Sequence, residues 1–164
     1  MDGASPAAAP EQDGPEAVSD EALLARFQNA RRRPPATETL GFRVLRIDQA
    51  AREIEVVCEG LPEFCNAAGQ IQGGFLMAML DETMSVAAVV ASGMTAFTPT
   101  LEMKTSFLKP ARPGRLRVVG RVVKWGRQIC FLEGELYDDR GQLLAKATST
   151  ALPQPFKQAT GRGA

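Results

Sequence analysis

The chain has 164 residues, with nineteen lysines and arginines balanced by nineteen aspartates and glutamates, and no histidine. A net charge of zero argues against general nucleic-acid binding, which needs a basic stripe. Without histidine, the Ser-His-Asp and Cys-His catalytic pairings and the common metal sites are excluded. The three cysteines are widely spaced and form no CxxC pair, so we predict neither a metal nor a cofactor.

Composition divides the chain into one domain and two tails. Residues 1–18 are rich in Ala, Pro, Gly and acidic residues, which predicts a disordered tail. Residues 19–152 are enough for a single domain with a sizeable core, and residues 153–164 are predicted to form a flexible tail. The N-terminus lacks a signal pattern, and the apolar stretch after Asp81 is interrupted too soon for a membrane span. We therefore expect a cytoplasmic protein that does not bind membranes.

The elements follow in a simple order. A helix is predicted over residues 19–33, capped by Ser19 and ended by Pro34, and three arginines at its end are typical of a solvated helix C-terminus. Alternating apolar residues predict a hairpin over 42–59, then a loop over 60–71 and a long helix over 72–91. Four strands follow, over residues 98–108, 115–125, 128–137 and 142–152. This order predicts an α+β fold in which an antiparallel sheet wraps one long helix.

The long helix, QGGFLMAMLDETMSVAAVVA, is apolar on almost every face and is therefore expected to be buried. Its two carboxylates, Asp81 and Glu82, conflict with burial, because ionised acids are rarely buried unless they are paired or functional. Asp81 is thus the strongest candidate for a catalytic residue; the alternative is a helix carboxylate that reaches a rim or caps a neighbour. Glu82 points about 100° away around the helix and is expected to face solvent or an interface.

Two glycines, Gly73 and Gly74, open this helix. Backbone amides at a helix start are unpaired and carry partial positive charge, and glycine leaves them unshielded, as an oxyanion hole for acyl transfer requires. The alternative is that the glycines allow close packing. Asp81 lies about 12 Å further along the helix, so one chain cannot bring both groups to one substrate. Two antiparallel copies in a symmetric dimer can.

Two polar residues flank the helix in the sequence. Asn66, seven residues before Gly73, could orient a thioester or a water molecule, although Asn in a Gly-rich loop is also typical of turn chemistry. Thr100 opens the strand after the helix and could donate a hydrogen bond to the acid.

The segment NAAGQIQGGFLMAMLDETMSVAA resembles the N-x-x-G-x-x-H-G-G-x-x-x-x-x-x-D motif of hotdog-fold acyl-CoA thioesterases. It is most similar to the phenylacetyl-CoA thioesterase (PaaI-like) branch of the 4-hydroxybenzoyl-CoA thioesterase superfamily. The resemblance covers residues 41–152, since the later strands match as well. It implies a hotdog fold, assembly into dimers and often tetramers, and metal-free hydrolysis of an acyl-CoA.

The resemblance also implies roles for individual residues. Asp81 would be the general base or nucleophile, the Gly73 N–H would form the oxyanion hole, Asn66 would position the substrate or water, and Thr100 would assist the acid. Gln72 occupies the place of the family's histidine. Glutamine can donate a hydrogen bond but cannot transfer a proton at neutral pH. Activity therefore survives if that histidine only polarises or orients the substrate, and falls if it protonates the leaving thiolate.

The phosphates of CoA require cations and close backbone contacts. Candidates for binding the substrate are the helix-start glycine Gly74 and residues at two turns, namely Lys109, Arg112, Arg115, Gly126 and Arg127. Cations at turns are also common as ordinary solvated charges. The apolar residues Phe75, Leu76, Met77 and Met79 could line an acyl pocket or simply belong to the core.

These features favour a thioesterase that hydrolyses an aryl- or medium-chain acyl-CoA as a homo-oligomer. The alternative is a non-catalytic acyl-CoA-binding protein, a sensor or carrier, which Gln72 favours. A hotdog dehydratase is a third possibility, but such an enzyme needs a histidine paired with its acid.

Overall fold

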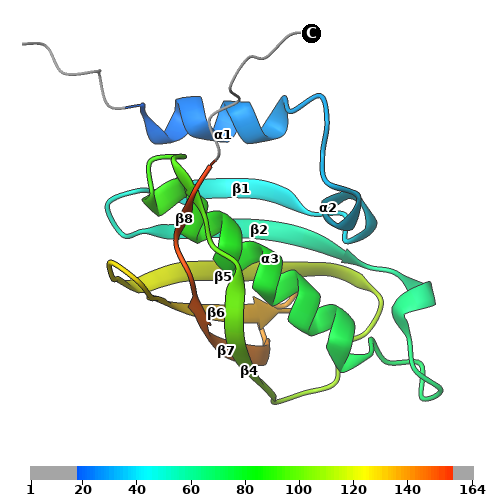
Figure 1. Ribbon diagram of the computed structural model, residues 1–164. Helices are drawn as coiled ribbons and strands as arrows, with labels where there is room; N and C mark the ends of the chain where they lie inside the picture. The colour runs from blue at the N-terminus through cyan, green and yellow to red at the C-terminus, as the bar shows by residue number, and fades with distance from the viewer. Residues whose placement is uncertain (1–17, 157–164) are drawn as a thin grey trace, which may run out of the picture.

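The computed structural model describes residues 18–156 (Figure 1), so the predicted tails fall almost entirely outside the described residues. The helices are α1 (Asp20–Gln28), α2 (Pro35–Thr39), the short 3-10 helix η1 (Pro62–Phe64) and α3 (Gly73–Ala91). The strands are β1 (Arg43–Asp48), β2 (Glu53–Gly60), β3 (Ala96–Phe97), β4 (Thr100–Phe107), β5 (Gly114–Trp125), β6 (Cys130–Tyr137), β7 (Leu143–Ala151) and β8 (Gln154–Pro155).

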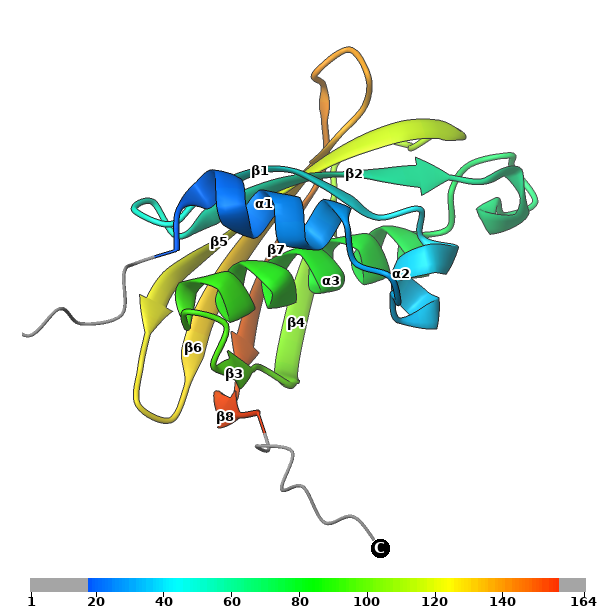
Figure 2. The same cartoon turned by 90° about the horizontal axis from the view of Figure 1, so that it is seen from above.

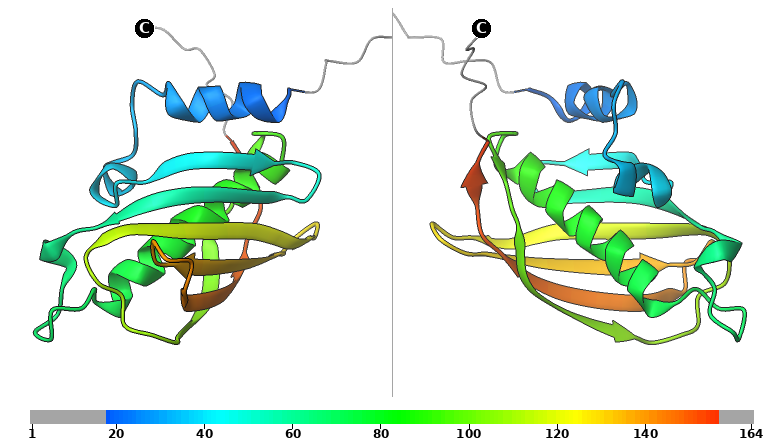
Figure 3. Two further views of the ribbon diagram at one scale, coloured as in Figure 1. Left: turned by 180° about the vertical axis from the view of Figure 1, so that it is seen from behind. Right: turned by 45° about the vertical axis from the view of Figure 1, so that its right-hand side comes forward.

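One antiparallel sheet of six strands, in the order β1-β2-β5-β6-β7-β4, curves around α3. This confirms the predicted α+β architecture. Seen from above, α3 lies along one face of the sheet (Figure 2), and the view from behind shows the other face with no helix over it (Figure 3). By length and composition α3 would suit a membrane span, but in this fold it is the core helix.

The hydrophobic core lies between α3 and the inner face of the sheet. Along β6 and β7 the burial alternates from residue to residue, as expected for strands with one buried face. The helix contributes Leu76, Met79, Leu80, Met84 and Ala88, all at most 3% exposed.

A pair of glycines sets how closely α3 approaches the sheet. Gly120 of β5 and Gly134 of β6 lie directly opposite each other in the ladder. A Cβ on Gly120 would lie 2.9 Å from the backbone oxygen of Thr83 and 3.0 Å from the amide nitrogen of Met84. The middle of α3 therefore rests on bare backbone, and no other residue type fits at Gly120 without moving the helix.

The N-terminal helix is shorter than predicted. α1 begins after its predicted cap, Ser19, but ends at Gln28, because the Asn29 side chain donates to the carbonyl of Ala25 and closes the last turn. Pro34 then restricts the residue before it to extended backbone. Pro35, predicted only to stop a helix, in fact begins α2. The three arginines, residues 31–33, thus lie in a linker and not in the last helical turn.

The two edges of the main sheet differ. At one edge α1 packs along β1 through Leu23, which is 2% exposed, as Figure 1 shows. At the other edge, within residues 18–156, β4 pairs only with β7. Beyond α3, the unpredicted strands β3 and β8 pair with each other, so Gln154 and Pro155, in the predicted C-terminal tail, hold the chain against the end of the helix.

We predict that Gly120→Ala lowers the free energy of unfolding by about 2–3 kcal/mol, because the new methyl group meets helix backbone that cannot move aside. Gly134→Ala is the matched control, since its methyl group would meet only the flexible ends of Leu80 and Met84, and should cost about 1 kcal/mol or less. Urea unfolding of both variants checks this. Equal losses would contradict backbone contact as the cause.

Candidate functional site

Asp81 lies halfway along α3 and points toward the start of β4. The hydroxyl of Thr100 donates to Asp81 Oδ1 at 2.7 Å. The Asp81 residue is half-buried and Thr100 is exposed, so the carboxylate is fixed on one side and open on the other. No other hydrogen bond to Asp81 occurs within the described part of the chain, which leaves Oδ2 free to accept a proton or contact a substrate.

The neighbouring acid, Glu82, for which the sequence predicts solvent or an interface, is directed toward α2. It is half-buried and accepts a hydrogen bond of 2.6 Å from the hydroxyl of Thr37 in α2. The reason is that α2, which sequence reasoning missed, packs beside α3 on the side opposite β4. The two adjacent carboxylates therefore contact different elements: Glu82 contacts α2, and only Asp81 is directed toward β4.

The start of α3 presents two unpaired backbone amides. Among residues 18–156 the N–H groups of Gly73 and Gly74 have no hydrogen-bond acceptor, as expected for the first turn of a helix. A Cβ on Gly74 would meet nothing within 4 Å, whereas one on Gly73 would lie 2.9 Å from the ring of Phe107. The packing interpretation thus applies in part to Gly73, while its amide still meets the requirement of an oxyanion hole.

Phe107 is the residue at this site that sequence reasoning overlooked. It ends β4, is 50% exposed, and places its ring against Gly73. An apolar ring at the end of an edge strand gave no distinct signal in the sequence, because its contact with Gly73 depends on how the sheet curves around α3.

The loop before α3 is built by Asn66. Its side-chain Oδ1 accepts from the amides of Ala68 and Gln70, at 2.9 and 3.3 Å, which is the turn chemistry weighed against a catalytic role. The side-chain nitrogen Nδ2 of Asn66 has no hydrogen-bond partner among the described residues, and the residue is exposed, so this group can still meet a substrate. Gln72 is the N-cap of α3, is exposed, and makes no side-chain capping bond.

The predicted phosphate-binding residues are divided between distant places. Lys109 and Arg112 are exposed in the turn between β4 and β5. This turn contacts the loop before α3, because the N–H of Ile71 donates to the carbonyl of Ala111. Arg115 is exposed on the outer face of β5. Arg127 and Gly126 lie at the opposite end of β5, where Gly126 is also needed for a tight turn because a Cβ would lie 2.4 Å from the carbonyl oxygen of Ile129. One chain does not gather these cations into one site.

The four apolar residues considered for an acyl pocket also separate. Leu76 and Met79 are buried in the core, and Phe75 stacks on Phe64 with ring centroids 4.1 Å apart. Phe75 and Met77 are both half-buried, and Met77 lies on the open side of α3 with Asp81. The core interpretation is therefore correct for Leu76 and Met79.

Comparison with known proteins places this geometry in a family. The model of the thioesterase superfamily matches residues 68–145. A phenylacetic acid degradation-related protein from Ralstonia eutropha, provisionally named a thioesterase, is 35% identical, with 79% of this chain and 98% of that chain covered and a TM-score of 0.72. A provisionally named esterase of Saccharolobus solfataricus is 29% identical over 66% of this chain and 75% of its own length.

A more distant structure, solved with acetyl CoA bound, is that of a Streptococcus mutans protein. It is 21% identical, covers 71% of this chain and 91% of its own, and has a TM-score of 0.64, which shows a shared fold. The matched family region contains Gly73, Asp81 and Thr100. The chain belongs to the thioesterase superfamily and has its hotdog fold, and its structural neighbours include PaaI-like phenylacetic acid degradation proteins.

Proposed function

We propose that the protein is an acyl-CoA thioesterase that hydrolyses aryl- or medium-chain acyl-CoA, with the Asp81 carboxylate as its general base or nucleophile. One observation carries the proposal: Thr100 holds one oxygen of Asp81 at 2.7 Å while the other remains open. A carboxylate oriented in this way can remove a proton from water or attack a thioester carbonyl directly.

The chemistry follows from the two groups on α3. As a general base, Asp81 takes a proton from water, whose oxygen attacks the thioester carbonyl. The carbonyl oxygen becomes an oxyanion and accepts a hydrogen bond from the free Gly73 amide. The C–S bond then breaks, the free acid is released, and the CoA thiolate takes up the proton that Asp81 removed from water, directly or through solvent. Gln72 can orient the substrate by donating a hydrogen bond, but it cannot supply that proton.

Two features support completion of the site by a second copy of the chain. Gly73 and Asp81 lie on one unbroken helix, about 12 Å apart along its axis, so they reach one carbonyl only across two chains. The edge of β4 is open, and Leu101, Phe107 and Leu108 beside it are at least 50% exposed. Pairing β4 with its symmetry mate would bring two α3 helices together antiparallel.

Small residues on the open face of α3 permit that approach. Gly74 and Ala78 are exposed, and Met77, Asp81 and Ser85 are half-buried on the same side.

In such a dimer, cations from opposite ends of β5 can be supplied by different chains. We therefore propose that Lys109 and Arg112 of one chain and Arg127 of the other bind CoA phosphates. Val123 and Phe131, exposed on the outer sheet face, are where two dimers would join as a tetramer.

A second candidate function is acyl-CoA binding without hydrolysis, as in a sensor or carrier. The observation that favours it is Gln72, exposed at the start of α3 with no group there that can transfer a proton. Tight binding of several acyl-CoAs with no release of thiol would select this function over hydrolysis.

Asp81→Asn is expected to reduce kcat for acyl-CoA hydrolysis at least about a hundredfold, because the amide cannot act as a base or nucleophile. Thr100→Val removes only the orienting hydroxyl and should cost less, about tenfold. Both should keep the wild-type melting temperature within a few degrees. Release of CoA from a panel of acyl-CoAs, followed with a thiol reagent, measures the effect, and full activity of Asp81→Asn would refute the assignment.

A complementation experiment tests the shared site. Gly73→Pro removes the amide donor at a position that suits proline, because it is the first helical residue and Gln72 already has a ψ of 138°. Refolded together, Gly73→Pro and Asp81→Asn chains should regain about a quarter of wild-type activity, since half of the dimers are mixed and each has one intact site. A mixture as inactive as either parent would place the whole site within one chain.

Gly73→Ala is the matched control for the proline variant. It adds the same Cβ against Phe107 but keeps the amide, so it should be much more active than Gly73→Pro. Equal losses in the two variants would show that the contact with Phe107, and not the amide, is what the reaction requires.

The protein's own thiols set the background of this assay. Burial raises the pKa of Cys58 to about 12 and also raises the pKa of Cys130, so both remain protonated and unreactive at pH 8. Cys65 is half-buried. We expect about one thiol per native chain to react quickly with a thiol reagent, and all three after unfolding in guanidinium. Rapid reaction of two or more would contradict the burial.

A further inference from the structure

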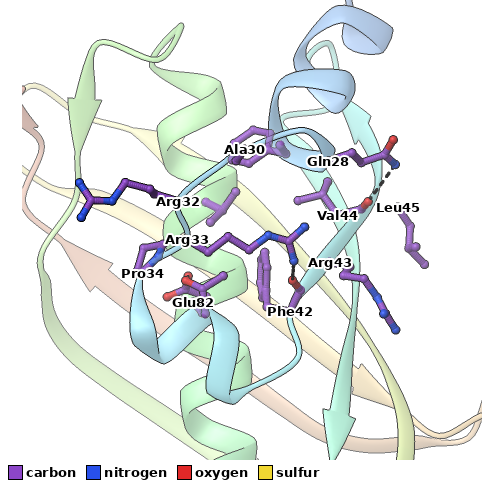
Figure 4. Close-up of a pocket in the computed structure, with 13 residues that line it drawn as sticks. Gln28, Ala30, Arg32, Arg33, Pro34, Phe42, Arg43, Val44, Leu45 and Glu82 are labelled. Carbon is purple, nitrogen blue, oxygen red and sulfur yellow. Dashed lines mark hydrogen bonds between the residues drawn. The ribbon is translucent and has the colours of Figure 1, made fainter.

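A cavity lies on the side of α3 away from β4. It has a volume of about 460 Å³, within the range of small-molecule sites, and lies between the α1–α2 linker, β1 and α3 (Figure 4). Its apolar walls are formed by Phe27, Phe42, Val44 and Val86. The thioesterase chemistry proposed above uses none of these residues.

The charges around this cavity are mainly positive. Arg32, Arg33 and Arg43 line it, against the single acid Glu82. Arg43 is already paired with Glu59 at 2.7 Å. Within residues 18–156, Arg32 and Arg33 form no ion pair, and Arg33 donates only a long bond of 3.4 Å to the carbonyl of Phe42. Two of the three arginines at the cavity are therefore not paired with any carboxylate of the described chain.

The cavity has a positive group, the Arg33 guanidinium, at its β1 side and a carboxylate, Glu82, at its α3 side. The Arg33 side chain extends across the opening toward β1, with its guanidinium beside Phe42 (Figure 4). Glu82 lies on the α3 side, near Pro34, and is already engaged by the hydroxyl of Thr37. A ligand anion placed at the β1 side would meet Arg33, and its apolar body would lie along Phe42 and Val86.

We propose that this cavity binds a small carboxylate with an apolar body, such as a medium-chain acid, with Arg33 as the group that binds the carboxylate. Guanidinium groups bind carboxylates through charge-assisted, often bidentate, hydrogen bonds, and the apolar walls account for the rest of the molecule. The site is separate from Asp81, because that carboxylate faces Thr100 on the opposite side of the helix. The binding does not depend on whether the protein hydrolyses thioesters.

Isothermal titration calorimetry with octanoate at pH 7.5 tests the proposal on the full chain. Wild type should bind octanoate, and Arg33→Gln should bind it about tenfold more weakly, because a charge-assisted bond is lost. Arg33→Lys should keep part of the affinity through its charge. Arg31→Gln is the matched control, since Arg31 is an exposed arginine in the same linker that does not line the cavity, and should bind as wild type does.

Two further arms separate this site from others. Octanamide, which has the same chain but no charge, should bind wild type about as weakly as octanoate binds Arg33→Gln. Asp81→Asn should bind octanoate with wild-type affinity. The proposal is overturned if wild type does not bind octanoate, if Arg33→Gln binds it unchanged while melting as wild type does, if octanamide binds as tightly as octanoate, or if Asp81→Asn loses the binding.

Discussion

The contact between α3 and the paired glycines of the sheet is the constraint on which the other features depend. Gly120 and Gly134 let the helix backbone at Thr83 and Met84 approach β5 and β6 directly. This contact fixes the rotation of α3 about its own axis. Since Asp81 and Glu82 are adjacent, a rotation of about 100° would turn Glu82 to the direction that Asp81 now faces. The glycine contact therefore decides which carboxylate meets Thr100 and which meets Thr37.

Much of the fold was predictable because its signals are local or periodic. Strand alternation, the turn residues between strands and the apolar helix opened by two glycines located β1, β2, β4 to β7 and α3 to within a few residues. The exceptions are short or depend on distant contacts. α2 has five residues and begins at the second of two adjacent prolines, residues that normally end a helix. β3 and β8 are two-residue strands that form only because the chain after β7 returns to the end of α3.

The candidate site was predictable in part for the same reason. The hydrogen bond between Thr100 and Asp81 was anticipated, since Thr100 opens the predicted strand that follows the helix carrying Asp81. The surroundings of Glu82 and the ring of Phe107 beside Gly73 were not, because each depends on an element brought in from elsewhere in the chain. Likewise, the proposed binding of a carboxylate by Arg33 was not predictable, because it depends on α1 ending at Gln28 and leaving the arginines in a linker.

The unequal edges of the sheet have a consequence for assembly. An open strand edge is a hazard, because it can recruit further chains without limit. Here α1 lies along β1 at one end of the sheet (Figure 1), whereas β4, at the other end, pairs only with β7 within the described chain. If two copies join through β4, both open ends are used up and both remaining ends are capped. The sheet can then grow once and must stop, so the arrangement that would complete the active site also protects the protein from forming fibres.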